Sequence, residues 1–253
     1  MKYAKIYTDK EKNATKWGII EEDTIFTLTK APYDGVEKDG GSVKLADAIL
    51  AAPCDATKIV AIGRNYYDHV MEFGNEVPAE PIIFIKPTTS LLDPNEKLAK
   101  PDFTNRFDYE GEIAVVFKKK AKNVKKEEAL DYILGYTCLN DITARDIQLA
   151  DNQWTRGKGL DGSAPVGPFV ADGLEHNNIG IKTYLNGEKR QDGNTNLMMW
   201  DIPSLIEYVT RYMTMLPGDV FTCGTPVNVG PMVPGDVIEI VGEGIGTLRT
   251  EII

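Results

Sequence analysis

The segment that most constrains this chain is Phe107–Phe117, which joins a run of acidic residues to a run of apolar ones. Its second half, Ile113–Phe117, is continuously apolar, which is typical of a strand buried on both faces. Its first half places Asp108, Glu110 and Glu112 at alternate positions. Because successive side chains on a strand point to opposite faces, we expect these carboxylates to share one face, with neighbouring side chains rooted roughly 6–7 Å apart.

Two carboxylates at this separation repel each other, and burying them beside an apolar core costs several kcal/mol unless a cation or an arginine neutralises them. A ligand set made only of oxygen favours a hard ion, Mg²⁺ or Mn²⁺ before Zn²⁺. The segment therefore favours a divalent-cation site at the acidic end of a core strand. On this segment alone, a solvated strand edge whose acids serve solubility is an equal alternative.

Composition narrows the class of partner. A chain of 253 residues that is 42% hydrophobic is long enough for one large domain, or for one large and one small domain. Its net charge of −10 argues against nucleic acid and anionic membranes as the main partner, because both require a basic face. We therefore expect the partner to be a small molecule.

The sequence also predicts a compartment. No apolar run approaches the roughly 20 residues of a membrane span, and Met1–Lys5 leads into no signal-peptide core. We therefore expect a cytoplasmic protein. Cys54, Cys138 and Cys223 lie far apart and form no Cys-x-x-Cys pair, so we expect buried reduced thiols rather than disulfides or zinc ligands.

Two domains are expected, a small β-rich N-terminal domain over residues 1–55 and a catalytic domain over 56–253. In the first, we expect strands at Tyr3–Tyr7, Lys16–Ile20 and Thr24–Leu28 and a short amphipathic helix at Val43–Ala52. In the second, we expect strands at Lys58–Ile62, Pro81–Lys86, Ile133–Leu139, Gly180–Leu185, Glu188–Gln191, Val220–Cys223 and Val237–Val241. Helices are expected at Lys126–Tyr132 and Asp201–Met213.

His69 and Glu72 follow the first strand of the catalytic domain and stand three residues apart, so one helical turn would make them neighbours. A carboxylate beside an imidazole fixes its tautomer and raises its basicity, so such a pair suits general-base catalysis. The alternative is an ordinary surface pair, which is the more common case. His176, the only other histidine, lies in a polar turn and is expected to be a solvated loop residue.

A second cluster follows the strand Ile133–Leu139. If a helix begins near Asp141, then Asp141, Arg145 and Gln148 lie on one stripe of that helix. The alternative is a helix cap followed by an ordinary ion pair. Lys86 ends an apolar strand, where it either reaches solvent or meets a carboxylate at a pocket rim.

Two loops complete the candidate site. Trp154–Pro168 is rich in glycine and proline but contains large apolar residues, which favours a shaped wall over a disordered linker. In it, Gly157 and Gly159 flank Lys158 and would let the backbone approach a ligand. Thr225 lies in a tight loop, where its hydroxyl either contacts a ligand carboxylate or simply supports the turn.

Taken together, in this order and spacing, the segments resemble the fumarylacetoacetate hydrolase family. The resemblance is to its shorter branch of acylpyruvate hydrolases, oxaloacetate decarboxylases and hydroxymuconate isomerase/decarboxylases. It extends from about Lys58 to the C-terminus. It rests on Gly63-x-Asn65-Tyr66-x-Asp68-His69-x-x-Glu72, Lys86-Pro87, Asp108-x-Glu110-x-Glu112, Asn140-Asp141-x-Thr143-x-Arg145-Asp146-x-Gln148, Arg156-Gly157-Lys158, Arg190-Gln191-Asp192-Gly193-Asn194-Thr195 and Gly224-Thr225-Pro226.

The resemblance implies a fold that is mainly β with α, with a mixed β-sandwich or β-roll catalytic domain, and a homodimer. It implies that a divalent ion, usually Mg²⁺ with Mn²⁺ or Ca²⁺ as alternatives, is held by Glu110, Glu112 and Asp141. It implies a dyad of His69 and Glu72 on a lid. It also implies that the substrate is surrounded by Lys86, Arg145, Gln148, Lys158 and Thr225. Asp108 is not part of the implied ligand set.

Our leading hypothesis from the sequence is a Mg²⁺-dependent hydrolase that cleaves a C–C bond in 2,4-dioxo acids (acylpyruvates) through a metal-bound enolate. In this hypothesis Lys158 and Arg145 add positive charge where the oxyanion develops, and His69 oriented by Glu72 takes a proton from water. One alternative is a decarboxylase or isomerase acting on oxaloacetate or on 2-hydroxymuconate-type acids. Another is a metal-dependent binding protein for 2-oxo acids without turnover.

Overall fold

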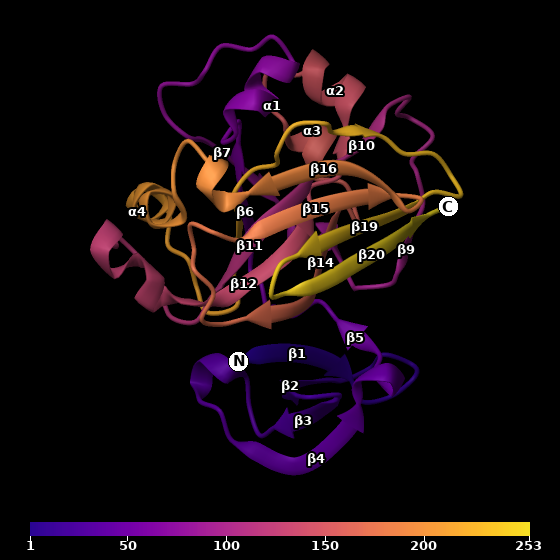
Figure 1. Ribbon diagram of the computed structural model, residues 1–253, viewed down its shortest axis with the longest axis vertical. Helices are drawn as coiled ribbons and strands as arrows, with labels where there is room; N and C mark the ends of the chain where they lie inside the picture. Colours follow the sequence, from indigo (N-terminus) through magenta and orange to yellow (C-terminus); the bar gives the residue numbers. More distant parts are fainter.

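A 12-stranded sheet runs through most of the computed structural model, which describes residues 1–253 (Figure 1). Its strands are β1 (Lys2–Tyr7), β2 (Thr15–Glu21), β3 (Thr24–Leu28), β4 (Lys38–Lys44), β5 (Leu50–Ala51), β6 (Ile59–Gly63), β7 (Ile82–Lys86), β8 (Leu91–Leu92), β11 (Gly111–Phe117), β12 (Ile133–Asn140), β14 (Ala164–Ala171) and β17 (Val220–Thr222). The main path is β4-β3-β2-β1-β14-β12-β11-β17-β6-β7, with β5 beside β1 and β8 beside β14. Because β17 pairs parallel with β6 whereas most other neighbours are antiparallel, the sheet is mixed.

Two smaller sheets complete the β structure. One contains β9 (Lys97–Leu98), β15 (Gly180–Leu185), β16 (Glu188–Asn194), β19 (Val237–Gly242) and β20 (Gly246–Ile252). The other contains β10 (Phe107–Tyr109), β13 (Thr143–Ala144) and β18 (Gly230–Pro231). The fold is therefore mainly β with a few helices, as predicted.

The helices are short and lie at the margins of the sheets. They are α1 (Tyr67–Glu72), α2 (Arg145–Ala150), α3 (Thr155–Lys158) and α4 (Ile202–Tyr212). The 3₁₀ turns are η1 (Pro32–Asp34), η2 (Leu45–Asp47), η3 (Thr88–Ser90), η4 (Lys126–Tyr132) and η5 (Thr195–Leu197). α4 begins where Asp201 Oδ1 accepts a hydrogen bond from the amide of Ser204 at 2.9 Å, a side-chain cap that satisfies a free helix donor. α1, α2 and α3 gather at one end of the molecule (Figure 1).

β11 is buried on both faces, as its apolar run predicts. Ile113, Val115 and Phe117 join a core cluster with residues of the five-stranded sheet and of α4. Ala114 and Val116 point the other way, into a second cluster. This burial holds the acidic end of the strand rigidly against the core.

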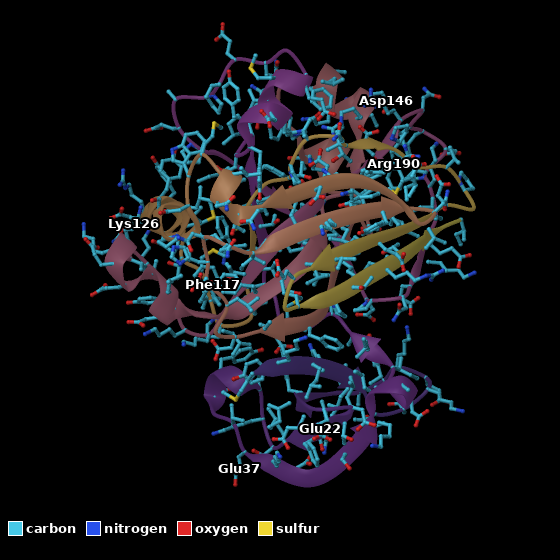
Figure 2. All side chains as sticks on the ribbon, viewed as in Figure 1. Glu22, Glu37, Phe117, Lys126, Asp146 and Arg190 are labelled. Carbon is cyan, nitrogen blue, oxygen red and sulfur yellow. The ribbon has the colours of Figure 1, made fainter.

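The N-terminal strands continue the main sheet rather than forming a separate one. β1 pairs antiparallel with β14, with Lys2 opposite Ala171 and Tyr3 opposite Val170. The second core cluster also spans this junction, because it contains Trp17 together with Val116. Figure 2 shows Glu22 and Glu37 in loops of the N-terminal part, away from the body that contains Phe117.

The predicted helix at Val43–Ala52 is wrong. Val43 lies in β4 opposite Ile25, residues 45–47 form η2, and Leu50 lies in β5 opposite Ile6. The apolar residues of this segment pack around Ile6 and Ile25. Strand pairing with β1 and β3 thus overrode the local helical spacing.

Two further expectations can be compared with the structure. All three cysteines are buried and free, as predicted. No helix of the structure is long and apolar enough to span a bilayer.

Candidate active site

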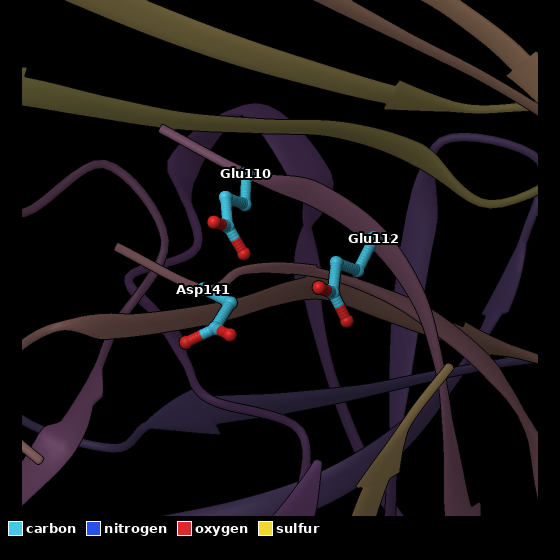
Figure 3. A group of neighbouring side chains, drawn as sticks. All are labelled: Glu110, Glu112 and Asp141. Carbon is cyan, nitrogen blue, oxygen red and sulfur yellow. The ribbon is translucent and has the colours of Figure 1, made fainter. Parts of the chain in front are cut away.

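Glu110, Glu112 and Asp141 gather around one point (Figure 3). Each is buried and offers a carboxylate oxygen, and these oxygens all lie within 4.8 Å of one another. Glu110 sits between β10 and β11, Glu112 lies in β11, and Asp141 follows β12. Because Gly111 of β11 pairs with Asn140 of β12, the chain brings Asp141 beside the two glutamates despite the distance in sequence. Three oxygen donors therefore face a common position.

The acidic segment is not one continuous strand, which corrects the prediction. Tyr109 pairs with Gly230 in the small sheet, whereas Gly111 pairs with Asn140 in the large one, so the chain changes sheet at Glu110. Asp108 lies before this break and accepts a hydrogen bond from Arg145 Nε at 2.9 Å. Its absence from the cluster of three carboxylates agrees with the predicted ligand set.

Two buried cations neutralise part of this negative charge. Lys158 Nζ lies 2.7 Å from Glu110 Oε2 and 2.6 Å from Asp141 Oδ2. Arg145 donates from Nη2 to Glu110 Oε1. Burial by itself raises the pKa of Glu110, but Lys158 and Arg145 outweigh it and hold that pKa well below its usual value.

Glu112 is in the opposite electrostatic situation. Burial, and then the negative charges of Asp141 and Glu110, raise the pKa of Glu112 well above its ordinary value. Its carboxylate accepts hydrogen bonds from the Thr222 hydroxyl and, at 3.0 Å, from the amide of Gly224. No ammonium or guanidinium contacts it directly, so a bound cation would relieve the repulsion that it experiences.

Lys86 lies beneath the carboxylates rather than at a pocket rim. Its side chain is fully buried, and Nζ lies 2.8 Å from Asp141 Oδ1. The ammonium also donates to the carbonyl oxygens of Lys158 and Ile142. Burial lowers the pKa of Lys86, although Asp141 opposes that shift. Lys86 therefore meets a carboxylate, as one of the two expectations held, and supports Asp141 from behind; its contact with substrate stays a prediction.

The helix predicted from Asp141 begins later. Asp141 and Ile142 are irregular, β13 follows, and α2 starts at Arg145, so the three stripe residues do not share one helix. They still converge, because Arg145 Nη1 donates to Gln148 Oε1 at 3.1 Å while Nη2 reaches Glu110. Asp141 reaches the site from the end of β12, and Arg145 and Gln148 reach it from α2.

The loop around Lys158 contains a single helical turn, α3. A Cβ on Gly157 would lie 2.7 Å from Gln148 Cβ, and one on Gly159 would lie 2.8 Å from the Thr155 carbonyl oxygen. Both glycines therefore permit close packing of α3 on its surroundings, and the close approach to a ligand stays a prediction. This packing fixes Lys158 next to α2.

His69 and Glu72 form the predicted pair on α1. His69 Nδ1 lies 3.1 Å from Glu72 Oε2, and the amide of Asn228 donates to Glu72 Oε1 at 3.1 Å. Since a carboxylate only accepts, Nδ1 carries the hydrogen and the lone pair of Nε2 is free. The pair is thus oriented by a loop from the other side of the site.

A narrow cavity of about 50 Å³ brings these groups together, several times the roughly 10–15 Å³ that one water requires. All of the predicted site residues line it except Lys86 and Glu72. Trp154 lines the cavity as the predicted wall loop requires. Sequence reasoning assigned no role to several other lining residues, which include Arg64, Phe73, Phe84 and Leu149. The only sequence signal for these residues is that they lie close along the chain to the recognised motifs.

Gln191 is a supporting residue whose role the sequence did not reveal. It is fully buried, and its Oε1 accepts from the amide of Gly111 at 3.0 Å. Its Nε2 donates to Thr225 Oγ1 at 2.9 Å and to the Pro226 carbonyl at 2.7 Å. Gln191 therefore ties the loop of Thr225 to the backbone between Glu110 and Glu112.

Comparison with known proteins identifies the family. A family model described as Fumarylacetoacetate (FAA) hydrolase C-terminal matches residues 58–253. The chain belongs to the fumarylacetoacetate hydrolase family. A second model, described as Rv2993c-like, N-terminal, matches residues 1–53.

Relatives in this family cover most of the chain. Protein Rv2993c of Mycobacterium tuberculosis is 41% identical, over 93% of this chain and 90% of that protein. Oxaloacetate tautomerase YisK of Bacillus subtilis is 38% identical, over 82% of this chain and 74% of that protein. Because the family members are enzymes, a binding protein without turnover is set aside, and the chain is an enzyme of this family.

Two solved structures of the family extend the comparison. The 5-carboxymethyl-2-hydroxymuconate delta-isomerase from Mycobacterium smegmatis is 37% identical with a TM-score of 0.93, covering 100% of this chain and 99% of that chain. The fumarylpyruvate hydrolase from Pseudomonas aeruginosa, solved in complex with Mn²⁺ and pyruvate, is 28% identical with a TM-score of 0.75, covering 79% of this chain and 94% of that chain.

The acidic cluster of this family member fits a divalent cation. Its donors are carboxylate oxygens only, the set that hard ions prefer. Asp141 Oδ1 is buried and accepts no well-formed hydrogen bond, although Lys86 Nζ lies near it. A buried acceptor without a hydrogen bond, next to a glutamate with a raised pKa, is the arrangement that a cation would satisfy.

Proposed function

We propose that this enzyme hydrolyses a C–C bond in 2,4-dioxo acids and that it requires a divalent cation, Mg²⁺ or else Mn²⁺ or Ca²⁺. The observation that carries the proposal is the presence, in one cavity, of three convergent carboxylates and an imidazole oriented by a carboxylate. The three carboxylates suit a hard cation, and the imidazole suits proton transfer.

Glu110, Glu112 and Asp141 would hold the cation, which supplies Lewis acidity at the carboxylate and 2-oxo oxygens of the substrate. Arg145 and Lys158 contribute positive charge on the same side of the cavity, where negative charge builds up on the 2-oxo oxygen. Gln148, also on this wall, offers its amide hydrogens to the substrate carboxylate.

His69 acts as the general base. Its Nε2 removes a proton from a water molecule that attacks the acyl carbonyl at C4. The C3–C4 bond then breaks, its electron pair moves to C3 and the 2-oxo group, and the acyl part leaves as a carboxylic acid. The imidazolium returns its proton to C3, which yields pyruvate and restores His69. Glu72 stabilises the imidazolium during this cycle.

Tautomerisation or decarboxylation of oxaloacetate is the second candidate. It is favoured by the relatives named oxaloacetate tautomerase and by the fact that the same residues serve it. In tautomerisation, His69 takes a proton from C3 and returns it to the 2-oxo oxygen. Decarboxylation requires no general base at C3, so it would depend less on His69.

A substitution at His69 tests the catalytic assignment. We expect His69→Gln to lower kcat for acetylpyruvate hydrolysis by about 10²–10⁴-fold, which is the contribution typical of general acid–base catalysis. Turnover is followed by ¹H NMR with acetylpyruvate and, separately, oxaloacetate. His176→Gln is the matched control, because His176 does not line the cavity. Wild-type hydrolysis by His69→Gln would exclude the dyad.

A substitution at Glu110 tests the metal assignment. We expect Glu110→Gln to weaken Mg²⁺ and Mn²⁺ binding by at least about 10-fold in calorimetry, since loss of one charged ligand removes a principal contact. Asp161→Asn is the control, because Asp161 is an exposed carboxylate in the turn after α3. Equal affinity in wild type and Glu110→Gln would refute this ligand set.

A further inference from the structure

The dyad depends on a contact from outside its own helix. Glu72 uses Oε2 for His69 Nδ1 and Oε1 for the amide of Asn228, each at 3.1 Å. Glu72 does not line the cavity, and no lysine or arginine pairs with it. α1 has only six residues and no side-chain cap at its N-terminus. The Asn228 amide is therefore the contact that fixes the Glu72 carboxylate beside His69.

The backbone conformation at Asn228 aims this amide. Its φ is +73°, in the left-handed region that glycine and asparagine tolerate and that β-branched residues avoid. Its side chain is exposed and takes part in no hydrogen bond of the chain, whereas its amide and its carbonyl oxygen both do. Asn228 therefore acts through its main chain, and its residue type matters because it permits this conformation.

Two buried side chains hold the loop on which Asn228 lies. The Tyr109 hydroxyl donates to the Asn228 carbonyl oxygen at 3.1 Å. Gln191 Nε2 donates to the Pro226 carbonyl oxygen at 2.7 Å. Tyr109 lies in β10 and Gln191 in β16, so the loop is fixed from the body of the protein and not from α1. The loop can therefore serve as a fixed support for Glu72.

We infer that Asn228 is a positioning residue that sets the tautomer of His69. The inference rests on the proposed function, in which Nε2 of His69 is the general base. With the amide on Oε1, Glu72 presents Oε2 to Nδ1, and a hydrogen on Nδ1 leaves the lone pair of Nε2 free to take a proton. The hydrogen bond at one ring nitrogen thus decides the chemistry at the other.

Loss of the amide would release Glu72. Its carboxylate also lines an outer groove that it shares with Asn228 and Tyr109, so it could turn away from the imidazole into that groove. His69 would then return to the tautomer that free histidine favours, in which Nε2 carries the hydrogen. In that form Nε2 has no lone pair for a proton, and the base of the proposed reaction is lost.

The effect of a substitution at Asn228 should follow the φ that the new residue permits. Asn228→Gly removes the side chain but keeps the left-handed conformation accessible. Asn228→Val keeps a side chain of comparable size but disfavours that conformation. A side-chain role would make the glycine variant the worse of the two, whereas a backbone role makes the valine variant worse.

Nitrogen NMR of the histidine rings tests the inference without requiring turnover or a bound cation. The chain has only two histidines, His69 and His176, so ¹⁵N-histidine labelling gives two rings, which His176→Gln assigns. Spectra are recorded roughly two pH units above the ordinary histidine pKa of about 6.5. We expect wild type and Asn228→Gly to show the Nδ1–H tautomer at His69. Asn228→Val should show mainly the Nε2–H tautomer.

Catalysis should rank the variants in the same order. Asn228→Val should lower kcat by about 10- to 100-fold, the range of hydrogen bonds to charged groups. Its KM should stay close to wild type, because Asn228 does not line the cavity. Asn228→Gly should retain nearly the wild-type kcat, which makes it the conservative rescue of the valine variant.

Asn123→Val is the matched control. Asn123 is also exposed and left-handed, with φ of +53°, but it lies between β11 and η4 and its amide donates to the Thr210 carbonyl oxygen. This substitution imposes the same kind of backbone strain, and it should leave the tautomer of His69 unchanged. Tyr109→Phe gives a second test, because it frees the loop at Asn228 without altering the backbone preference there.

Three results would overturn the inference. One is a wild type without the Nδ1–H tautomer at His69. Another is an Nδ1–H tautomer that survives in Asn228→Val, or in Tyr109→Phe should the valine variant not fold. The third is an equal loss of that tautomer in Asn123→Val. If the tautomer follows Asn228 but no dioxo acid is hydrolysed, the proposed reaction fails while the positioning role stands.

Discussion

At the scale of single residues, the three clustered carboxylates have unequal surroundings. Glu110 contacts both Arg145 and Lys158, and these cations keep its pKa low even though it is buried. Glu112 has only neutral hydrogen-bond donors, so burial and its acidic neighbours raise its pKa. One more positive charge would therefore stabilise the ionised form of the cluster. Glu112, which contacts no cation, is the carboxylate that this charge would stabilise most.

This asymmetry predicts how cation affinity depends on pH. A cation binds the ionised carboxylate, and the raised pKa of Glu112 makes protons compete with the cation for that carboxylate. Affinity should therefore rise with pH and proton release should accompany binding, as measured by Mn²⁺ calorimetry at several pH values in buffers of different ionisation enthalpy. Glu112→Gln, which has no proton to release, should flatten the profile. Unchanged proton release in that variant would contradict the role of Glu112.

At the scale of elements, the parallel strands β17 and β6 carry site residues to the cavity at the same edge of the sheet. Thr225 follows β17 and Arg64 follows β6. The two strands begin at a shared junction where Asp219 accepts from the amide and hydroxyl of Thr57 at 2.8 Å and lies 2.5 Å from Lys58 Nζ. Asp219 therefore fixes the relative position of both strands at the end remote from the site.

Replacing Asp219 should destabilise the fold. Asp219 is fully buried, so we expect Asp219→Asn to lower the free energy of unfolding by roughly 2–4 kcal/mol, as measured by urea denaturation. The chain supplies a matched control, because Asp236 stands in a second Pro-Gly-Asp turn but makes its hydrogen bonds near the surface. Asp236→Asn should cost less than about 1 kcal/mol. Equal effects of the two substitutions would contradict the structural role of Asp219.

The same residue predicts an acid dependence of stability. Burial raises the pKa of Asp219, but its hydrogen bonds to Lys58 and to backbone amides outweigh this and leave the pKa lowered. Its contribution is therefore complete above the unfolded-state pKa of about 3.9 and is lost as the pH falls through the folded-state value. The difference in stability between wild type and Asp219→Asn should accordingly shrink on acidification below about pH 4.

At the scale of the whole molecule, one edge of the large sheet is apolar and unpaired. β7 is the last strand on its side, and its residues Ile82, Ile83 and Phe84 are half-buried while Ile85 is 45% exposed. An apolar edge strand presents free backbone groups that favour pairing with another chain. We propose that two copies of the chain associate through this edge.

Light scattering coupled to gel filtration tests this proposal. We expect wild type to elute with twice the chain mass of 28.0 kDa. Ile85→Lys should shift it toward the monomer, because a charge at the edge opposes pairing. Val36→Lys is the control, since Val36 is also 45% exposed but lies in the loop before β4. A dimer that Ile85→Lys leaves intact would place the interface elsewhere.

The sequence by itself determined the fold class and the chemistry of the candidate site. The apolar run Ile113–Phe117 predicted a core strand, and the acids before it made a neutralising partner one of two expectations, because alternation and charge are local properties. The i, i+3 spacing of His69 and Glu72 likewise predicted their contact, because one helical turn suffices to form it.

Only the tertiary structure decided how these local features combine. Whether Val43–Ala52 becomes helix or strand, where the acidic segment changes sheet, and whether Lys86 faces the cavity or supports Asp141 all depend on which distant strands pair. The same holds for Asn228, whose contact with Glu72 is visible only once the loop after β17 is placed beside α1. Pairing between distant segments is set by burial of the whole core, and no local pattern in the chain contains that information.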